Sequence, residues 1–333
     1  MALKTNKERA PRNRTINLTK QELNKYRERF HSLQAAVRIG DICNTIICQD
    51  VFDALPHLPP DSVDLVIADP PYSIAKDFRS QSCSERSLEE YEHWLRKWIP
   101  DVPALLKPHG SFYICGDWRS SAAIHMVLRD YFHVQNRITW QREKGRGAKY
   151  NWKNCSEDIW FCTKSHDYTF NVEEVKLKRT VRAPYTDKRG QPKDWAQTSH
   201  GRFRLTHPSN FWNDITVPFW SMPENTDHPT QKPEKLLAKL VLASSNKGNL
   251  ILDLFSGSGT ASVVAKKLDR NYIGIEVDEV YCALAEKRLD LAEEDQTIQG
   301  YADGVFWERN TKRLQQKARN KDKNDKMTSN RLF

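Results

Sequence analysis

Residues 62–72 read Ser62-Val63-Asp64-Leu65-Val66-Ile67-Ala68-Asp69-Pro70-Pro71-Tyr72, and this stretch says most about the architecture. Its apolar, β-branched run over 63–68 predicts a buried strand. Asp69, Pro70, Pro71 and Tyr72 follow at the carboxyl end of that strand, where α/β sheets hold their ligands. Because the two prolines lack N–H donors and stiffen the turn, the local carbonyls face outward as acceptors. A carboxylate with a free carbonyl can accept both hydrogens of an amino group, and a tyrosine ring can stack on the base that carries it.

A glycine-rich turn lies in the C-terminal half of the chain. The sequence predicts a strand over 250–254, a helix over 260–268 and a strand over 272–276. The turn between the first two reads Asp253-Leu254-Phe255-Ser256-Gly257-Ser258-Gly259. Its glycines permit tight backbone geometry and close approach of a ligand. Glu276 ends the next strand, where an acidic residue can hydrogen-bond ribose hydroxyls.

This turn alone is equally compatible with NAD or flavin binding, or with a purely structural turn. Two features favour another ligand. The third glycine of the dinucleotide fingerprint is missing, because Ala261-Ser262 follows instead. Asp253 would also repel a pyrophosphate, whereas it suits the ammonium group of a methionine moiety.

The segment His228-Pro229-Thr230-Gln231-Lys232-Pro233 leads into a predicted helix that begins near Pro233 and ends near Ser244. Proline is favoured at the first position of a helix. Thr230 and Lys232 could bind a carboxylate at this helix start, although an ordinary helix cap explains them equally well.

The chain of 333 residues carries a net charge of +9, which is concentrated in segments. Residues 1–38, which show helical potential from Leu18 to Val37, contain ten Lys and Arg against three Asp and Glu, and residues 301–333 contain nine against four. A net acidic body with basic appendages is typical of a nucleic-acid enzyme. Seven cysteines without a C-x-x-C pair predict neither a disulfide framework nor a metal site. No apolar run reaches the about 18 residues of a membrane span, and no secretory signal is expected, so we expect a cytoplasmic protein.

Further strands are expected at 45–48, 111–115 and 138–141. The capping box at Ser87 predicts a helix whose stripe of Tyr91, Trp94, Leu95 and Trp98 is most simply core packing. Residues 142–225 differ, because strand signals weaken, prolines recur and aromatic residues alternate with Lys and Arg.

The order of the three signatures DPPY, HPTQKP and FSGSG resembles the β class of DNA amino-methyltransferases over about residues 39–292. The resemblance implies an α/β fold, a circularly permuted, Rossmann-like S-adenosylmethionine-dependent methyltransferase with a mostly parallel sheet. It divides the chain into a basic arm (1–38), a catalytic half (39–141), an inserted target-recognition region (142–225), a cofactor-binding half (226–295) and a basic tail (296–333).

The resemblance also implies roles for individual residues. Asp69, Pro70, Pro71 and Tyr72 would bind the amine, and the turn from Asp253 to Gly259 would hold S-adenosyl-L-methionine. Glu276 would hold its ribose, Thr230 and Lys232 its methionine tail, and Asp50 its adenine, although Gln49 stands where the family has glycine. Trp140 matches a region associated with the target base, and a core tryptophan explains it equally well.

The implied substrate is double-stranded DNA, methylated at the N6 amine of a flipped-out adenine in a short recognition sequence. Asp69 in place of serine favours adenine over the N4 amine of cytosine. An RNA or protein-amide methyltransferase and a catalytically idle DNA-binding specificity partner stay open as more distant interpretations. Carbon-5 cytosine methylation is excluded because no proline precedes a cysteine. The resemblance leaves room for a homodimer and for a separate cognate restriction endonuclease of a type II-like restriction–modification system.

Overall fold

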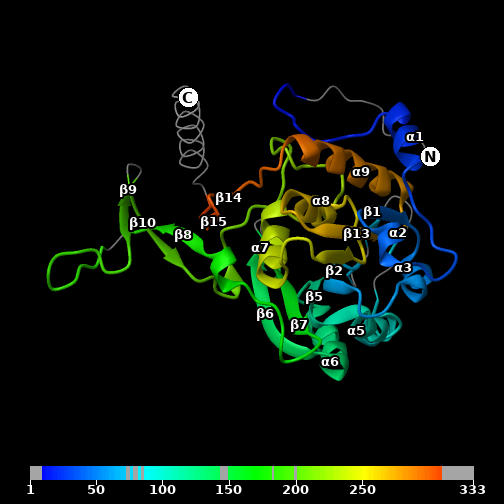
Figure 1. The fold of residues 1–333 in the computed structure, drawn as a ribbon, viewed down its shortest axis with the longest axis horizontal. Helices are drawn as coiled ribbons and strands as arrows, with labels where there is room; N and C mark the ends of the chain where they lie inside the picture. Colours follow the sequence, from blue (N-terminus) through cyan, green and yellow to red (C-terminus); the bar gives the residue numbers. More distant parts are fainter. Residues whose placement is uncertain are drawn as a thin grey trace.

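A computed structural model describes residues 10–72, 76–77, 82–83, 86–142, 149–181, 184–198 and 201–309. Eight strands form its main sheet (Figure 1). In spatial order these are β1 (Thr45–Cys48), β13 (Asn271–Glu276), β12 (Leu250–Asp253), β2 (Val63–Ala68), β5 (Leu106–Gly116), β7 (Ser156–Thr163), β6 (His133–Gln141) and β11 (Phe211–Trp212). Neighbours are parallel except that β7 runs antiparallel to β5 and β6. The mostly parallel α/β sheet expected from the sequence is confirmed.

Helices cover both faces of this sheet. The helices α7 (Glu234–Ser244), α8 (Thr260–Lys267) and α9 (Glu279–Glu294) pack on one face. The other face carries α2 (Ile39–Ile42), α3 (Val51–Ala54), α4 (Leu88–Leu95), α5 (Val102–Leu105) and α6 (Ser121–Tyr131). Two separate hydrophobic clusters result, one on each side, because the central strands bury both of their faces as a parallel sheet requires.

The expected elements form with small shifts of their bounds. The strands at 45–48 and 63–68 are confirmed as predicted, whereas β5 and β6 begin five residues earlier than expected. Pro233 is the N-cap residue of α7 and has extended backbone, so the helix begins at Glu234 and not at Pro233. The N-terminal helical potential yields only α1 (Lys20–Arg27), after which the chain runs beside β1 through a bridge between His31 and Ile47.

The boundary expected at residue 142 falls inside the main sheet. β7 lies between β5 and β6, so residues 156–163 belong to the main sheet, although the predicted target-recognition region includes them. A second sheet lies beside the main one. In spatial order, its strands are β14 (Tyr301–Ala302), β15 (Val305–Trp307), β8 (Leu177–Thr180), β10 (Gly201–Thr206) and β9 (Ala196–Thr198). β8, β9 and β10 project away from the main body (Figure 1). A short pair, β3 (Lys76–Asp77) and β4 (Ser82–Cys83), completes the strands.

The described part of the tail expected at 296–333 is therefore built into the fold. β15 pairs with β8 in parallel, so residues 305–307 connect the C-terminal region to a strand of the segment predicted to recognise the target. Trp307 is fully buried and packs edge-on against Phe203 of β10. Residues 310–333 lie outside the described residues.

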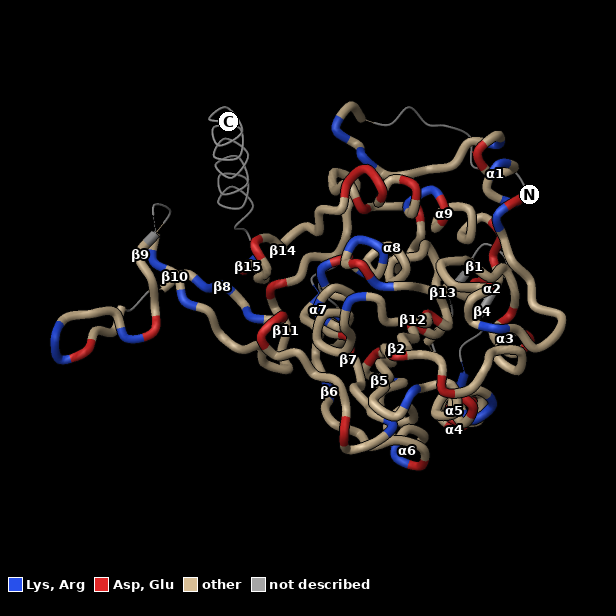
Figure 2. The backbone as a smooth tube through the Cα atoms, viewed as in Figure 1, with Lys and Arg blue, Asp and Glu red and all other residues tan. Residues whose placement is uncertain are grey.

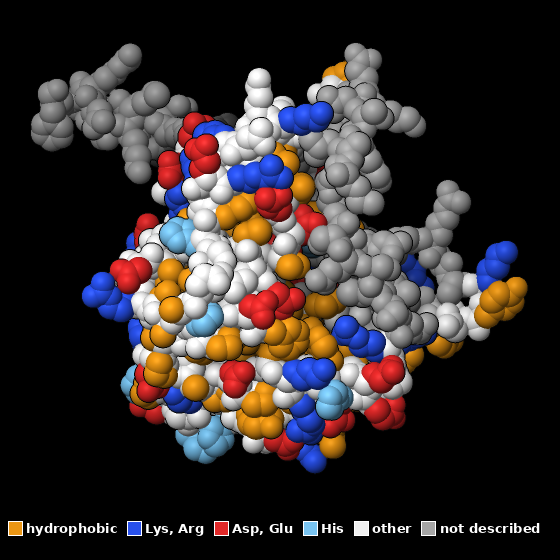
Figure 3. Space-filling view, turned by 90° about the vertical axis from the view of Figure 1, so that its right-hand side faces the viewer, with side chains coloured by type: hydrophobic (Ala, Val, Ile, Leu, Met, Phe, Trp, Pro, Cys, Tyr) orange, Lys and Arg blue, Asp and Glu red, His pale blue; other side chains and the backbone are white. Residues whose placement is uncertain are grey.

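The basic N-terminal arm packs on the acidic helix α9. Arg29 pairs with Asp290 at 2.6 Å and Arg27 with Glu279 at 2.5 Å, while the Tyr26 hydroxyl also donates to Asp290. These pairs neutralise arginines that the sequence suggested for DNA contacts. Figure 2 shows Lys and Arg instead along β8 and β10. On the face seen in Figure 3, outside the grey residues, basic, acidic and hydrophobic side chains are interspersed, so no single charge dominates it.

No helix in the described ranges is long and apolar enough to cross a membrane.

Candidate active site

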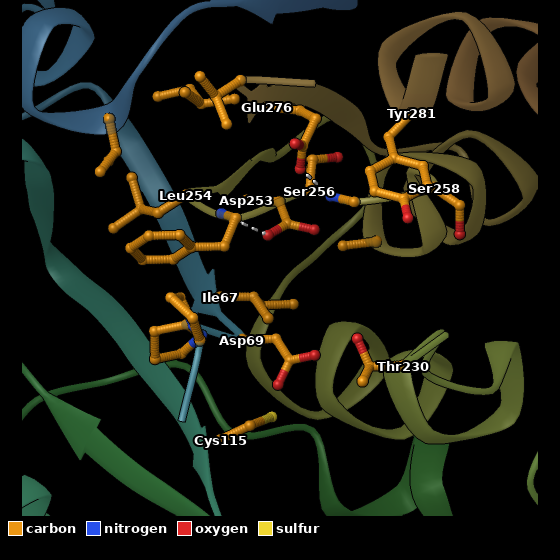
Figure 4. Close-up of a pocket in the computed structure, with 18 of the residues that line it drawn as sticks. Ile67, Asp69, Cys115, Thr230, Asp253, Leu254, Ser256, Ser258, Glu276 and Tyr281 are labelled. Carbon is orange, nitrogen blue, oxygen red and sulfur yellow. Dashed lines mark hydrogen bonds between the residues drawn. The ribbon is translucent and has the colours of Figure 1, made fainter. Parts of the chain in front are cut away.

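One pocket lies at the carboxyl ends of β2, β12 and β13 (Figure 4). This is the place expected for a ligand in an open α/β sheet. It gathers nearly all of the residues predicted from the sequence: Asp50, Asp69, Pro70, Pro71, Tyr72, Thr230, Lys232, Asp253, Phe255, Ser256, Gly257, Ser258 and Glu276. Gly259 and Trp140 are the predicted residues that do not line it. Asp50 and Glu276, which are far apart in the chain, thus share one cavity.

Asp69 is held by two donors. The Tyr72 hydroxyl donates to its Oδ1 at 2.9 Å, and the Lys232 ammonium donates to its Oδ2 at 2.5 Å. Burial and the charge of Asp69 hold the pKa of Tyr72 well above its ordinary value, so the phenol stays protonated as a donor. The sequence suggested Lys232 for a ligand carboxylate, and the structure instead places its ammonium on Asp69, the carboxylate predicted to bind the amine.

Glu157 of β7 is a site residue that sequence reasoning missed. It is 4% exposed, and its Oε2 lies 3.4 Å from the Nζ of Lys232. Its other oxygen pairs with Arg142. The only signal in the sequence was an acidic residue within a weak strand pattern, which does not say which face of the sheet it occupies.

The glycine-rich turn is shaped by close approach at both glycines. Gly257 has φ +51°, and a Cβ there would lie 2.9 Å from the Nε2 of His228. Gly259 has φ +75°, and a Cβ there would lie 2.5 Å from the Cβ of Ala285 on α9. Gly259 therefore permits packing of α8 on α9, while Gly257 leaves room on the pocket side.

Arg288 supports this turn from beneath. Its side chain is 1% exposed and donates to the carbonyl of Ser258 at 2.7 Å and to Thr260 at 3.0 Å. Its other nitrogen pairs with Glu234 at the start of α7 at 3.1 Å. A buried guanidinium thus joins the turn to the helix that follows the HPTQKP segment.

Two carboxyl groups in the pocket are poorly solvated. Burial raises the pKa of Asp253 to about 7, with Asp69 and Glu276 adding to the effect. Burial likewise raises the pKa of Glu276 to about 7, although its oxygens accept N–H bonds from Gly257 and Asp278 at 2.8 Å. Such groups favour a ligand that brings positive charge or hydroxyl donors.

Aromatic side chains form the wall beside β12. The rings of Trp94 and Phe255 are 5.9 Å apart, and Phe52 meets Trp94 edge-on at 6.1 Å. The aromatic stripe that the sequence predicts to be core packing covers α4 and the turn that follows it, which contains Trp98. The prediction holds for Tyr91, Leu95 and Trp98, which are buried, but Trp94 lines the pocket.

Asp50 stands at the pocket rim, where its side chain caps α3 by accepting the N–H of Phe52 at 2.9 Å. The departure from glycine at Gln49 has a structural reason. Its amide accepts the N–H of Leu33 at 2.7 Å and donates to the Leu33 carbonyl at 3.1 Å. Gln49 thereby fastens the N-terminal arm to the end of β1.

Thr230 and Trp140, which the sequence also suggested for the site, lie in different surroundings in the structure. Thr230 lies in the pocket wall near Asp69 (Figure 4). Trp140 is 1% exposed, belongs to the hydrophobic core and donates its indole N–H to the carbonyl of Ile215 at 3.3 Å. It does not line the pocket, so the core interpretation describes its position.

Comparison with known proteins agrees with this geometry. A family model described as DNA methylase matches residues 63–287. The chain is 32% identical over 250 residues to the type II methyltransferase M.HpaI of Haemophilus parainfluenzae, covering 74% of both chains. It is 34% identical over 261 residues to the DNA adenine methyltransferase YhdJ of Escherichia coli, covering 77% of this chain and 85% of the relative.

Solved structures show the same fold. The PvuII DNA methyltransferase, which is cytosine-N4-specific, aligns with a TM-score of 0.53 at 19% identity, covering 75% of this chain and 91% of that one. The family is established by the match of the family model, which spans most of the described core, and by the sequence identities to M.HpaI and YhdJ. The chain belongs to the DNA methylase family, the S-adenosylmethionine-dependent methyltransferases of N6 and N4 amines.

Proposed function

We propose that this protein transfers a methyl group from S-adenosyl-L-methionine to the N6 amine of adenine in a short sequence of double-stranded DNA. The observation that carries the proposal is that Asp69 and Tyr72 share one pocket with the glycine-rich turn around Gly257. The relative YhdJ, which is named as a DNA adenine methyltransferase, and aspartate in place of serine at position 69 favour adenine over cytosine.

The pocket's chemistry fits the cofactor. Asp253 and Glu276 offer carboxylates to a ligand that carries cationic groups and ribose hydroxyls. Trp94, Phe52 and Phe255 offer aromatic surface to an adenine ring. When bound, S-adenosylmethionine supplies an electrophilic methyl group on its sulfonium. Asp253 and Glu276 would attract this cationic ligand and so favour its binding.

The target base has to leave the duplex, because its amino group is otherwise paired and out of reach. Asp69 and the Pro70 carbonyl then accept the two amine hydrogens, which directs the nitrogen lone pair outward. Tyr72 holds the orientation of Asp69 through its 2.9 Å hydrogen bond. The residues therefore contribute positioning and electrostatics, and no covalent intermediate on the protein is needed.

Sequence choice belongs to the projecting strands. β8 and β10 carry Arg179, Arg202 and Arg204, all at least partly exposed, on an extension away from the pocket. Arginine side chains suit both phosphate contacts and the edges of guanine. The activity is expected in the cytoplasm. A second copy of the chain and a cognate endonuclease are further expected partners, and light scattering of the purified protein tests the first.

The decisive experiment combines two measurements. Purified protein is incubated with DNA and tritiated S-adenosylmethionine, and the modified nucleosides are then identified by mass spectrometry. N6-methyladenine at one short sequence is the expected product. N4-methylcytosine would replace the adenine assignment, and cofactor binding without methyl transfer would favour an idle specificity partner. Sequencing modified bases in DNA from expressing cells gives the recognition sequence.

A further inference from the structure

Glu157 is a buried carboxylate that lies outside the three sequence signatures of the family. It reaches the amine site from β7, with its Oε2 3.4 Å from the Nζ of Lys232 and 3.5 Å from the hydroxyl of Tyr72. A carboxylate that is only 4% exposed is costly unless its charge is compensated. Arg142 and Lys232 provide that compensation.

Lys232 consequently lies between two acids. Its Nζ is 2.5 Å from Asp69 and 3.4 Å from Glu157, while the Tyr72 hydroxyl accepts a third hydrogen bond at 3.2 Å. The ammonium side chain is 8% exposed, so this arrangement is shielded from water. Asp69, Glu157, Lys232 and Arg142 form one cluster, in which the charges of two carboxylates and two cations cancel.

This balance has a consequence for Asp69. An ammonium on Asp69 draws electron density from the carboxylate that has to accept an uncharged amine, and so weakens it as an acceptor. A second carboxylate within reach allows the ammonium to leave Asp69 without becoming an unpaired buried charge. Glu157 is positioned for this, because a small side-chain movement of Lys232 would close the 3.4 Å gap.

We propose that Glu157 is a positioning residue for methyl transfer, which holds the Lys232 ammonium and receives it from Asp69 when the target amine docks. The inference rests on the proposed function and deepens it. It adds no proton transfer, since Lys232 stays an ammonium throughout. Its effect falls on the reactive complex and not on cofactor binding.

The first test is Glu157→Gln, with Asp158→Asn as the matched control. Asp158 is the next residue of β7, and it accepts hydrogen bonds from Thr139 at 2.9 Å and Ser121 at 2.8 Å, away from the cluster. Glu157→Gln should lower kcat by about 10- to 100-fold, the range expected when a reacting group is misplaced. The Kd for S-adenosylmethionine should stay within about twofold, and Asp158→Asn should retain wild-type kcat.

A second measurement separates this role from a structural one. Lys232→Met leaves Asp69 and Glu157 as facing acids, so adding Glu157→Gln should recover activity relative to Lys232→Met alone. If the reduction of kcat in the double variant equals the product of the reductions in the two single variants, the proposal is overturned. The double variant also carries the same net charge as wild type, so it decides the question if Glu157→Gln alone melts far below wild type.

The outcome is distinct from failure of the proposed function. If wild-type protein methylates no DNA, the proposed function fails. If wild-type protein methylates DNA and Glu157→Gln has the same kcat as Asp158→Asn, the positioning role of Glu157 is refuted, whereas the proposed function stands.

Discussion

The backbone N–H of Leu254 donates a hydrogen bond of 3.1 Å to the carbonyl oxygen of Ile67. This bond continues the parallel pairing of β12 with β2, in which Asp253 stands opposite Ile67. The glycine-rich turn and Asp69 therefore leave the sheet side by side. In the proposed function, the turn that would hold the methyl donor and the carboxylate that would hold the target amine are therefore neighbours because β12 pairs with β2.

Asp69→Ala should abolish measurable methyl transfer or lower kcat by about 100- to 1000-fold, because the amine loses its charged acceptor. Cofactor affinity should change little, since Lys232 retains Glu157 as a partner. Isothermal calorimetry with S-adenosylmethionine and a tritium-transfer assay measure the two effects. If the variant loses both cofactor binding and activity, Asp69 belongs to the cofactor-binding site and not to the amine-binding site.

Gly257→Val should weaken S-adenosylmethionine binding by tenfold or more, about 1.4 kcal/mol. The new side chain would meet the ring of His228, whose Nε2 lies 2.9 Å from the Cβ position. Gly248→Val is the matched control, because Gly248 also has positive φ, at +78°, but open space around its Cβ position. Equal cofactor affinities in the two variants would make the Gly257 turn purely structural.

Cofactor affinity should rise as pH increases from about 5.5 through 7 and level off above about 8, where both carboxyls are ionised. The pKa values of Asp253 and Glu276 are raised to about 7 by burial, so both carboxyls are protonated at the acidic end of this window. A cationic ligand favours the ionised form, and binding therefore releases protons. Asp253→Asn should flatten the profile, leaving the part due to Glu276. Calorimetry in buffers of different ionisation enthalpy counts the released protons, and a flat wild-type profile would contradict the prediction.

Replacing Arg202 and Arg204 of β10 by Gln should reduce discrimination between target and scrambled duplexes. The log–log salt slope should also fall by about one unit for each phosphate that the variant no longer neutralises. Arg27→Gln with Arg29→Gln is the control, because those arginines pair with Glu279 and Asp290 on α9. DNA binding at several salt concentrations measures both. If the control pair changes the salt slope more than the β10 pair does, the N-terminal arm and not β10 contacts the DNA.

Arg288→Met should destabilise the protein by about 1–3 kcal/mol, because the buried Ser258 carbonyl loses its donor, whereas Glu234 keeps Lys267 as a partner at 2.7 Å. Arg96→Met removes a surface arginine paired with Glu92 and Asp130, and it should cost less than about 1 kcal/mol. Urea unfolding followed by circular dichroism compares them. Equal midpoints would show that the buried pair adds nothing to stability.

Elements whose patterns are local could be predicted from the amino-acid sequence. The run before Asp69 predicted β2 with its observed bounds, because a continuous β-branched stretch followed by two prolines leaves little choice of structure. The turn at Gly257 was predicted for a similar reason, since positive φ selects glycine. Together with the segment from His228 to Pro233, these two motifs also carried the family resemblance, and with it the permuted order of the sheet.

Which distant residues meet depends on the packing of the whole chain. The position of β7 between β5 and β6 brings Glu157 to Lys232, and that depends on strand pairing across the sheet. The side of α4 that carries Trp94 reaches the pocket because Phe255 arrives from β12. The N-terminal arginines look like a DNA-binding arm until α9 supplies their acidic partners. Local patterns fix φ, ψ and burial, whereas contacts between segments far apart in the chain depend on packing that no single window of sequence contains.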